Sequence, residues 1–249
     1  MNADDPAQPV PSLASLDDLF STRRVAEGML ELAPAFHKAV GQFWRVPLEG
    51  CHLSPRVKEL VLLAMHVSAT SLNGDAVRRQ VLRVLAAGGT REEIADVVTT
   101  IVSLANHSVY ASVPVLEEEW AACGGVAPPV GEQSAGMEAM KRRFIAIRGF
   151  WNSEREPLMR QMPDYFAALT ELATVTWGQG PLSRKEREFI CIGIDCTVTH
   201  TYTPGMRIHI RNAIGEGATR EEILEIFQLA ALMGVESYIM AAEALFERE

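Results

Sequence analysis

The sequence is poor in the features that mark several common protein classes. Its 249 residues include only four cysteines, too few for a disulfide scaffold, and no two of them form a C-x-x-C pair. No zinc-binding signature is present. No apolar run approaches the roughly 20 residues that span a bilayer. These absences argue against a disulfide-rich, a zinc-finger and a membrane-spanning protein.

The N-terminal segment and the charge balance narrow the class further. The segment MNADDPAQPVPSLASLDD has neither the basic nor the apolar region of a signal peptide, so we expect a cytoplasmic protein. Only 23 Lys and Arg stand against 32 Asp and Glu, and the net charge of −9 lacks the basic footprint of a nucleic-acid binder. With 48% hydrophobic and 22% charged residues, the composition indicates a soluble globular protein with no nucleic-acid or membrane partner.

The two halves of the chain repeat each other at one constant offset. Residues 90–94 and 219–223 both read TREEI. The other matching positions, all at the same offset, are Pro34 and Pro163, Leu53 and Leu182, Glu59 and Glu188, and Gly88 and Gly217. An offset that stays constant from one motif to the next indicates a duplicated domain.

A segment rich in glycine and proline separates the repeats. Residues 123–136 read CGGVAPPVGEQSAG, which is typical of a linker. We therefore expect a flexible tail at 1–15, a first helical repeat at 16–121, a linker at 122–136 and a second helical repeat at 137–249.

Helix signals recur at equivalent places in the two repeats. Gly88 and Gly217 suit the left-handed position that ends a helix. Thr90 and Thr219 then start the next helix as N-caps, and a glutamate three residues later completes a capping box. Apolar residues follow at helical spacing, and no segment favours a strand. The sequence therefore predicts an all-α fold.

Titratable side chains gather in the second repeat. Glu188 lies in a mostly apolar helix, His200 and Tyr202 lie in the irregular stretch after it, and His209 follows near the start of the next helix. A buried carboxylate facing histidines is a plausible acid–base set. The alternative is structural: Glu188 satisfies a helix end or an arginine, and His209 is simply hydrogen-bonded.

The pattern Leu182-Ser-x-x-x-x-Glu188, His209-Ile-Arg211-x-Ala213 and Gly217-Ala-Thr-x-Glu-Glu-Ile223 resembles the carboxymuconolactone decarboxylase family, which also contains alkylhydroperoxidase D-like proteins. The resemblance extends to both halves and implies two tandem helical domains of this type. Single-domain relatives form hexameric rings, so it also implies a homotrimer that builds a pseudo-hexameric ring.

The peroxidase branch of this family uses a C-x-x-C pair that this sequence lacks. Counted back from His209, the two cysteine positions hold Tyr202 and Gly205. Cys191 and Cys196 are five residues apart on the apolar helix, and we interpret them as core packing. A thiol peroxidase is therefore not expected, because it needs a reactive thiolate and a resolving partner.

The decarboxylase branch keeps a His-x-Arg at this helix start and implies loss of CO2 from a small carboxylated lactone without metal or organic cofactor. Loss of CO2 leaves a dienolate, which needs an oxyanion stabiliser and a proton donor. The resemblance suggests His209 as electrophile or proton donor and Glu188 as its acid–base partner. His200 and Tyr202 are expected to line the pocket. Arg211 is expected to hold a substrate carboxylate or, alternatively, to form a salt bridge between subunits.

The first repeat departs from this pattern. Glu59 is kept, but Gln80 stands at the histidine position and Leu82 at the arginine position. His66, seven residues after Glu59, is interpreted as a core residue. The first repeat is therefore expected to be a degenerate structural copy that contributes a wall to the pocket of the second.

Two other functions stay open at this point. The same pocket could serve an isomerase or cyclase in a biosynthetic pathway, because a partly degenerate tandem copy suggests divergence from aromatic catabolism. The loss of the thiols and of one complete site also fits a non-catalytic small-molecule-binding or scaffold protein. Retention of Glu188 together with His209 favours catalysis.

Overall fold

The computed structural model describes residues 13–71, 73–126 and 135–246, and this part of the chain is helical with no strand. The expected tail at 1–15 and linker at 122–136 fall mostly outside these described residues. The helices are α1 Arg23–Leu32, α2 Pro34–Glu49, α3 Pro55–His66, α4 Gly74–Ala86, α5 Arg91–Ile101, α6 His107–Ala122, α7 Ala135–Arg148, α8 Arg155–Gln161, α9 Pro163–Val175, α10 Arg184–Cys196, α11 Thr203–Gly215, α12 Arg220–Ala231 and α13 Met233–Phe246. Short 3-10 helices lie at Asp17–Leu19, Val102–Asn106 and Thr176–Gly178. The all-α prediction is confirmed.

The helices follow the repeat seen in the sequence. Helices α3, α4 and α5 begin at the positions that correspond to the starts of α10, α11 and α12, at the same constant offset. Gly88 and Gly217 have φ values of +85° and +84°, the left-handed conformation expected of them. Capping boxes start α5 at Thr90 and α12 at Thr219, as predicted. Local signals therefore start these helices at equivalent positions in both repeats.

Helices α3 and α10 form the centre of one core that both repeats share. Leu62 on α3 and Ile192 on α10 are both 0% exposed. The two helices approach closely at Gly193, where an added Cβ would lie 2.9 Å from the Met65 Cε. The apolar character of both helices is therefore explained by burial against each other.

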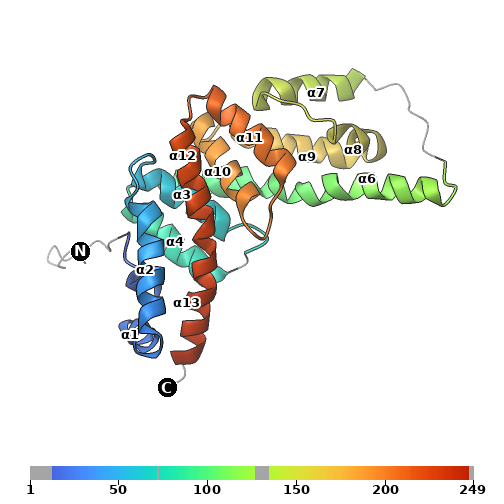
Figure 1. Ribbon diagram of the computed structural model, residues 1–249. Coiled ribbons are helices and arrows are strands. Elements are labelled where there is room, and N and C mark those ends of the chain that lie inside the picture. Colours follow the sequence, from blue (N-terminus) through green and yellow to red (C-terminus); the bar gives the residue numbers. More distant parts are fainter. Residues whose placement is uncertain (1–12, 72, 127–134, 247–249) are drawn as a thin grey trace, which may run out of the picture.

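The last helix of each repeat packs on the other repeat (Figure 1). Helix α13 lies beside α1, and α6 lies beside α8. A second, smaller apolar cluster forms there, in which Tyr110 and Val113 of α6 meet Leu158 and Phe166. The two repeats are intertwined, and neither packs its own first and last helices together in isolation.

Two buried ion pairs join the repeats at equivalent places. The Arg187 guanidinium donates to both oxygens of Asp96 at 2.7 and 2.6 Å. At the equivalent positions, the Lys58 Nζ lies 3.3 Å from the Glu225 Oε1. Each carboxylate also accepts a backbone N–H just before the opposite central helix, from Leu182 and from Leu53 respectively. All four charged groups are therefore satisfied across the junction.

One helical stretch, Arg220–Phe246, is long and apolar enough to cross a membrane by composition alone. Half of its most apolar window is buried inside the molecule. Ile226, Leu229 and Ile239 of this stretch belong to the shared core. Its apolar character is that of a core element in a soluble helical protein, and the cytoplasmic location stays a prediction.

Candidate functional site

His209 and Glu188 meet in the core of the second repeat. The His209 Nδ1 lies 2.6 Å from the Glu188 Oε2, and the Asn212 amide donates to Oε1 at 3.0 Å. His209 is 3% and Glu188 1% exposed. Because a carboxylate oxygen accepts, the short contact assigns the proton to Nδ1 and leaves Nε2 of the imidazole for the pocket. The predicted partnership of these two residues is present in the structure.

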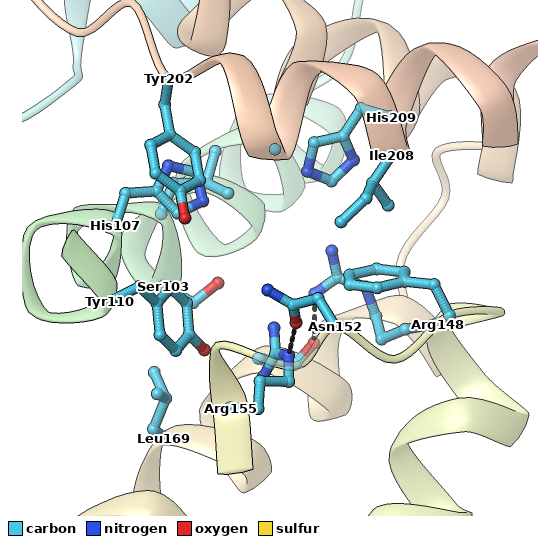
Figure 2. Close-up of a pocket in the computed structure, with 14 residues that line it drawn as sticks. Ser103, His107, Tyr110, Arg148, Asn152, Arg155, Leu169, Tyr202, Ile208 and His209 are labelled. Atoms are coloured by element: carbon cyan, nitrogen blue, oxygen red, sulfur yellow. Dashed lines mark hydrogen bonds between the residues drawn. The ribbon is translucent and has the colours of Figure 1, made fainter. Parts of the chain in front are cut away.

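His209 borders a pocket that both repeats build (Figure 2). Polar side chains that line it are Ser103, His107 and Tyr110 from the first repeat and Arg148, Asn152, Arg155, Tyr202 and His209 from the second. His209 and Tyr202 lie on one side, and Arg148 and Arg155 on the other. The cavity is small, about 30 Å³. A second cavity of about 780 Å³, mostly apolar, shares Leu104, His107 and Tyr202 with it.

Two buried arginines face the pocket from either side of a turn. Arg148 is the last residue of α7 and Arg155 the first of α8, and between them Gly149 turns the chain at a φ of +78°. Their exposed fractions are 3% and 6%. Within the described residues, neither guanidinium forms an ion pair with a carboxylate, and Arg148 Nε and Arg155 Nη1 have no hydrogen-bond partner.

Aromatic rings and one neutral acceptor each hold these guanidinium groups instead: Arg148 donates to the Ala173 carbonyl at 3.0 Å and Arg155 to the Asn152 amide oxygen at 2.8 Å. Arg148 stacks 3.9 Å above the Trp177 ring, and Arg155 stacks 3.9 Å above the Phe144 ring. Burial lowers the pKa of Arg148 to about 10 and also lowers the pKa of Arg155, because desolvation penalises the charged form. Two desolvated cations with free donors form a site that favours an anion.

Asp195 lies beneath His209 on the same helix stripe as Glu188. Its Oδ2 is 4.0 Å from the His209 Nε2, and its side chain is fully buried. Burial, reinforced by the charge of Glu188, raises the pKa of Asp195 to about 8. Burial likewise lowers the pKa of the neighbouring His107 to about 2, with nearby positive groups adding to the shift. The surroundings of His209 and His107 are therefore strongly desolvated.

His200 and Tyr202 also lie at this site. The Tyr202 ring stacks on His107 with 3.9 Å between centroids, and its hydroxyl donates to the Glu154 Oε2 at 2.6 Å. Burial raises the pKa of Tyr202, so the phenol keeps its proton. His200 borders the larger cavity and contacts His107. The structure thus brings together four of the five predicted site residues.

Arg211 is the residue that the structure does not bring to the pocket. It lies two positions after His209 on α11 and is exposed, whereas His209 is buried. Residues i and i+2 of a helix face different directions, so both side chains cannot serve one site. An intersubunit role for Arg211 stays a prediction.

Sequence reasoning missed Arg148, Arg155 and His107. Arg148 and Arg155 lie in the least repetitive part of the second repeat, where Leu19 and Ala26 stand at the equivalent positions of the first. His107 comes from the first repeat and reaches the site only because α6 crosses to the other half. A signal was available, since Arg148 and Arg155 flank a run of Gly149, Phe150 and Trp151 that suggests a turn beside aromatic rings.

The cysteines behave as the sequence suggested. Cys191 is fully buried and Cys196 half-buried, and both are free. Burial raises the pKa of Cys196 to about 12 and raises that of Cys191 as well. Thiols of this kind are poor nucleophiles.

In the first repeat, the positions equivalent to this site are satisfied by neighbouring side chains, one of them from α13 of the second repeat. Glu59 accepts two hydrogen bonds from Arg83, at 2.7 and 3.0 Å, and one from the Gln80 amide at 2.6 Å. The His66 Nε2 contacts the Glu236 Oε1 at 3.0 Å, and Arg79 binds both oxygens of Glu236. Each of these two carboxylates, Glu59 and Glu236, is therefore neutralised by an arginine.

Comparison with known proteins agrees with this picture. The model of the carboxymuconolactone decarboxylase family matches residues 163–248, the part of the chain that holds Glu188 and His209. A protein from Burkholderia xenovorans LB400, assigned provisionally as a gamma-carboxymuconolactone decarboxylase subunit and solved at 1.70 Å, is similar over nearly the whole length. The two chains are 32% identical with a TM-score of 0.84, covering 95% of this chain and 97% of that one. Among curated proteins there is no significant match.

The likeness to the solved structure extends through both repeats, since it covers 95% of this chain. The expected fold of two tandem helical domains of this type is confirmed. With 32% identity at this coverage, the chain belongs to the carboxymuconolactone decarboxylase family.

Proposed function

We propose that the protein is a carboxy-lyase that removes CO2 from a small carboxylated lactone or a related β-keto-type acid. One observation carries the proposal: a buried imidazole held by a carboxylate, His209 with Glu188, faces two buried guanidinium groups that lack a carboxylate partner among the described residues. The family and the provisional assignment of the solved relative support the same class of reaction.

The arginines define the substrate class in this proposal. Arg148 and Arg155 bind a carboxylate that stays on the substrate or the lactone oxygen that becomes negative. Charge-assisted hydrogen bonds in a desolvated pocket stabilise such an oxyanion strongly. The carboxylate that is lost points away from them, since an ion pair with it would stabilise the ground state and slow the reaction.

His209 supplies the proton. The bond from carbon to CO2 breaks, its electron pair passes into the dienolate, and the Nε2–H of a protonated His209 delivers the proton to carbon. Glu188 accepts from Nδ1–H, fixes the ring orientation and stabilises the imidazolium before transfer. Glu188 does not line the pocket, so it acts as a positioning residue.

The test is CO2 release from γ-carboxymuconolactone by the wild type and by matched variants. His209→Ala is expected to lower kcat by about 10²-fold or more, the range of acid–base catalysis. Arg155→Met is expected to raise KM by roughly 10- to 100-fold, because hydrogen bonds to charged groups contribute about 1.5–3 kcal/mol. Arg155→Lys, which keeps the charge, should fall between Arg155→Met and wild type.

Unchanged turnover in His209→Ala would remove the acid–base assignment. A wild type that releases CO2 from neither this lactone nor β-keto acids would refute the lyase proposal. The same pocket would then be tested for isomerisation and for binding without turnover.

We also propose a homotrimer as the functional assembly. Large apolar side chains point outward on α2 and α6, among them Phe36, Phe43, Leu116 and Trp120, each at least 50% exposed. Apolar surface of this kind favours association. Light scattering on the eluted peak should give three times the 27.3-kDa chain mass, and a monomer mass at micromolar concentration would contradict the proposal.

A further inference from the structure

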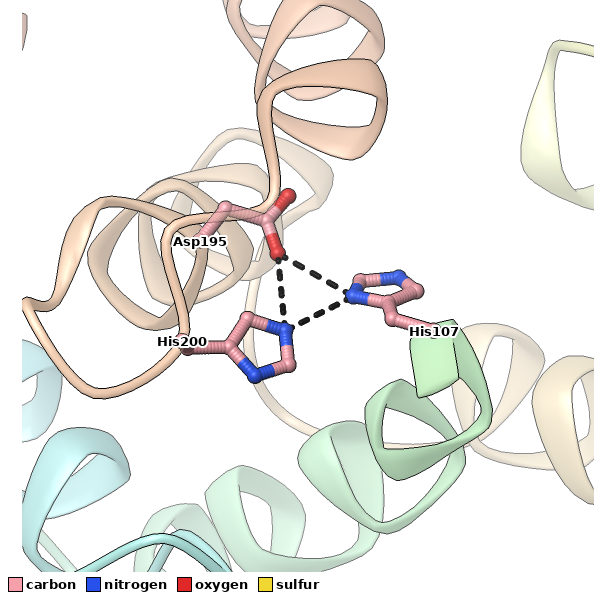
Figure 3. Close-up of side chains that lie close together, drawn as sticks. All are labelled: His107, Asp195 and His200. Carbon is pink, nitrogen blue, oxygen red and sulfur yellow. Dashed lines mark hydrogen bonds and ion pairs between the residues drawn. The ribbon is translucent and has the colours of Figure 1, made fainter. Parts of the chain in front are cut away.

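Three side chains from different parts of the chain converge beside the pocket (Figure 3). Asp195 comes from α10, His200 from the loop that follows, and His107 from the first turn of α6 in the other repeat. The His107 Nδ1 lies 2.8 Å from the His200 Nε2. The Asp195 Oδ1 lies 3.4 Å from the former and 3.6 Å from the latter. Two imidazole nitrogens and one carboxylate oxygen thus form a compact triangle.

The size of this triangle matches a metal ion. The circle through three atoms separated by 2.8, 3.4 and 3.6 Å has a radius of about 1.9 Å. An ion slightly out of that plane lies about 2.0–2.1 Å from all three atoms, which is the usual distance for zinc to imidazole nitrogen and carboxylate oxygen. No side chain has to move to bring the three atoms to bonding distance.

The Asp195 carboxylate is the second observation that points to a ligand. It is 0% exposed, and neither of its oxygens has a hydrogen-bond partner among the described residues. The His107 Nδ1 and the His200 Nε2 contact each other, but this contact provides no hydrogen-bond donor for the Asp195 carboxylate. Buried carboxylates without a hydrogen bond are rare, because desolvation costs more than the fold usually tolerates. A shared cation satisfies all three groups at once.

The surrounding structure holds the three ligands in place. Tyr202 stacks on the His107 ring, and the Tyr202 backbone N–H donates to the Asp195 carbonyl at 2.9 Å, which closes the loop that carries His200. Within that loop, Thr201 has a φ of +36°, an unusual conformation for a residue with a side chain. Gly205 leaves room for the carboxylate, since a Cβ there would be 2.5 Å from the Asp195 Oδ2. The constellation is therefore preorganised.

We propose that His107, Asp195 and His200 bind one divalent transition-metal ion with the ligand preference of zinc. Two imidazoles and a carboxylate are ligands that zinc and its neighbours in the first transition row accept, and three protein ligands leave positions open for water or substrate. His107 and His200 also line the larger cavity, so small molecules in it reach the ion. This departs from the sequence-based expectation of no metal, because ligands drawn from both repeats give no recognisable spacing.

The test measures binding without any substrate, so its result is independent of the proposed lyase activity. The full-length chain is stripped with EDTA, exchanged into metal-free buffer and titrated with Zn²⁺ by calorimetry. Co²⁺ is added separately, and its visible absorption reports four- or five-coordinate binding by nitrogen and oxygen. The variants are His200→Ala, on a partly exposed loop, and Asp195→Asn, which keeps the side-chain shape. His52→Gln is the control, because His52 is exposed and far from the triangle in sequence.

The expected result is one Zn²⁺ per chain, with affinity lowered at least about 100-fold in His200→Ala and Asp195→Asn and unchanged in His52→Gln. Loss of a direct ligand should exceed the 10- to 100-fold effect typical of outer contacts. Circular dichroism checks that each variant is folded. Stoichiometric binding that survives in both folded variants, or no binding of Zn²⁺ and Co²⁺ at micromolar concentration, overturns the proposal and leaves a hydrogen-bonded triad.

Discussion

The two repeats place side chains at equivalent positions, but the residues at these positions differ in their chemistry. In the second repeat, Glu188 holds His209 and Asn212; in the first, the equivalent Glu59 holds Gln80 and Arg83. The geometry is shared: a glutamate on a central helix accepts from two side chains one turn apart on the next helix. Only the second version contains an imidazole, the side chain most often used for proton transfer.

The difference continues one layer outward. Where the second repeat places Asp195 against His107, the first places His66 against Glu236, so that acid and imidazole have changed places. Arg79 then neutralises Glu236, whereas the equivalent of Arg79 is the apolar Ile208, which leaves the pocket open. In the first repeat the site is structural, because Arg83 pairs with Glu59 and Arg79 pairs with Glu236. In the second repeat, Arg148 and Arg155 face a cavity instead, and the site stays available for chemistry.

The largest expected effect comes from giving the second repeat the residue of the first. His209→Gln keeps an amide donor for Glu188, as Gln80 does for Glu59, but it carries no transferable proton. We expect kcat for decarboxylation to fall by about 10²- to 10⁴-fold, with little loss of thermal stability. The reverse change, Gln80→His, should not create activity. Turnover retained by His209→Gln would show that the histidine is not what distinguishes the second repeat from the first.

The next effect concerns the free energy of unfolding, and its loss should be larger in the first repeat than in the second. Glu59→Gln leaves the buried Arg83 guanidinium without its carboxylate and should destabilise the fold by about 3–5 kcal/mol. Glu188→Gln keeps an oxygen acceptor beside His209 and Asn212 and leaves no arginine unpaired, so it should cost about 1–3 kcal/mol while reducing activity. Urea unfolding of both variants measures the difference, and an equal or larger loss in Glu188→Gln would contradict it.

A moderate effect is expected at the start of the two equivalent helices. Ala76 in α4 is fully buried, whereas the equivalent Gly205 in α11 lies against Asp195. An added Cβ at Gly205 would be 2.8 Å from the Tyr202 ring as well, so Gly205→Ala should destabilise by about 1–3 kcal/mol through overpacking. Thermal denaturation checks this, and a stabilised variant would show that the Asp195 side chain is not confined.

The smallest effect is expected for Arg211. It and the equivalent Leu82 are both exposed on their helices. Arg211→Ala should change the free energy of unfolding by less than about 0.5 kcal/mol and leave KM unaltered. Size-exclusion chromatography of the same variant tests the intersubunit alternative, which would appear as a loss of the trimer.

Local features of the fold were predictable from the sequence. The constant offset between the repeats, the capping boxes at Thr90 and Thr219 and the glycines that end α4 and α11 can all be read from short segments of the chain. The family resemblance suggested the partnership of Glu188 with His209. Whether the two side chains touch was not predictable, because the loop between their helices has no geometry that can be derived from its residues. Family resemblance supplied the reaction class that we propose.

Features that depend on how the repeats cross were not predictable. His107 and Tyr110 reach the pocket only because α6 leaves its own repeat, and nothing in their local pattern marks this. Arg148 and Arg155 have a meaning only when both point into one cavity, which requires the turn at Gly149 and the aromatic rings around it. Arg211 has a side chain that could bind a carboxylate, but it lies on the exposed face of α11, away from the pocket.

The crossing of terminal helices also has a consequence for synthesis on the ribosome. Helix α1 packs against α13, which is made more than 200 residues later. At about 5–20 residues per second, the apolar face of α1 waits roughly 10–40 s for that partner. During this interval Val25 and Met29, both almost completely buried in the finished protein, have no final contact there. The nascent first repeat thus exposes an apolar face during synthesis, and truncation before α13 should yield an aggregating product rather than a smaller folded domain.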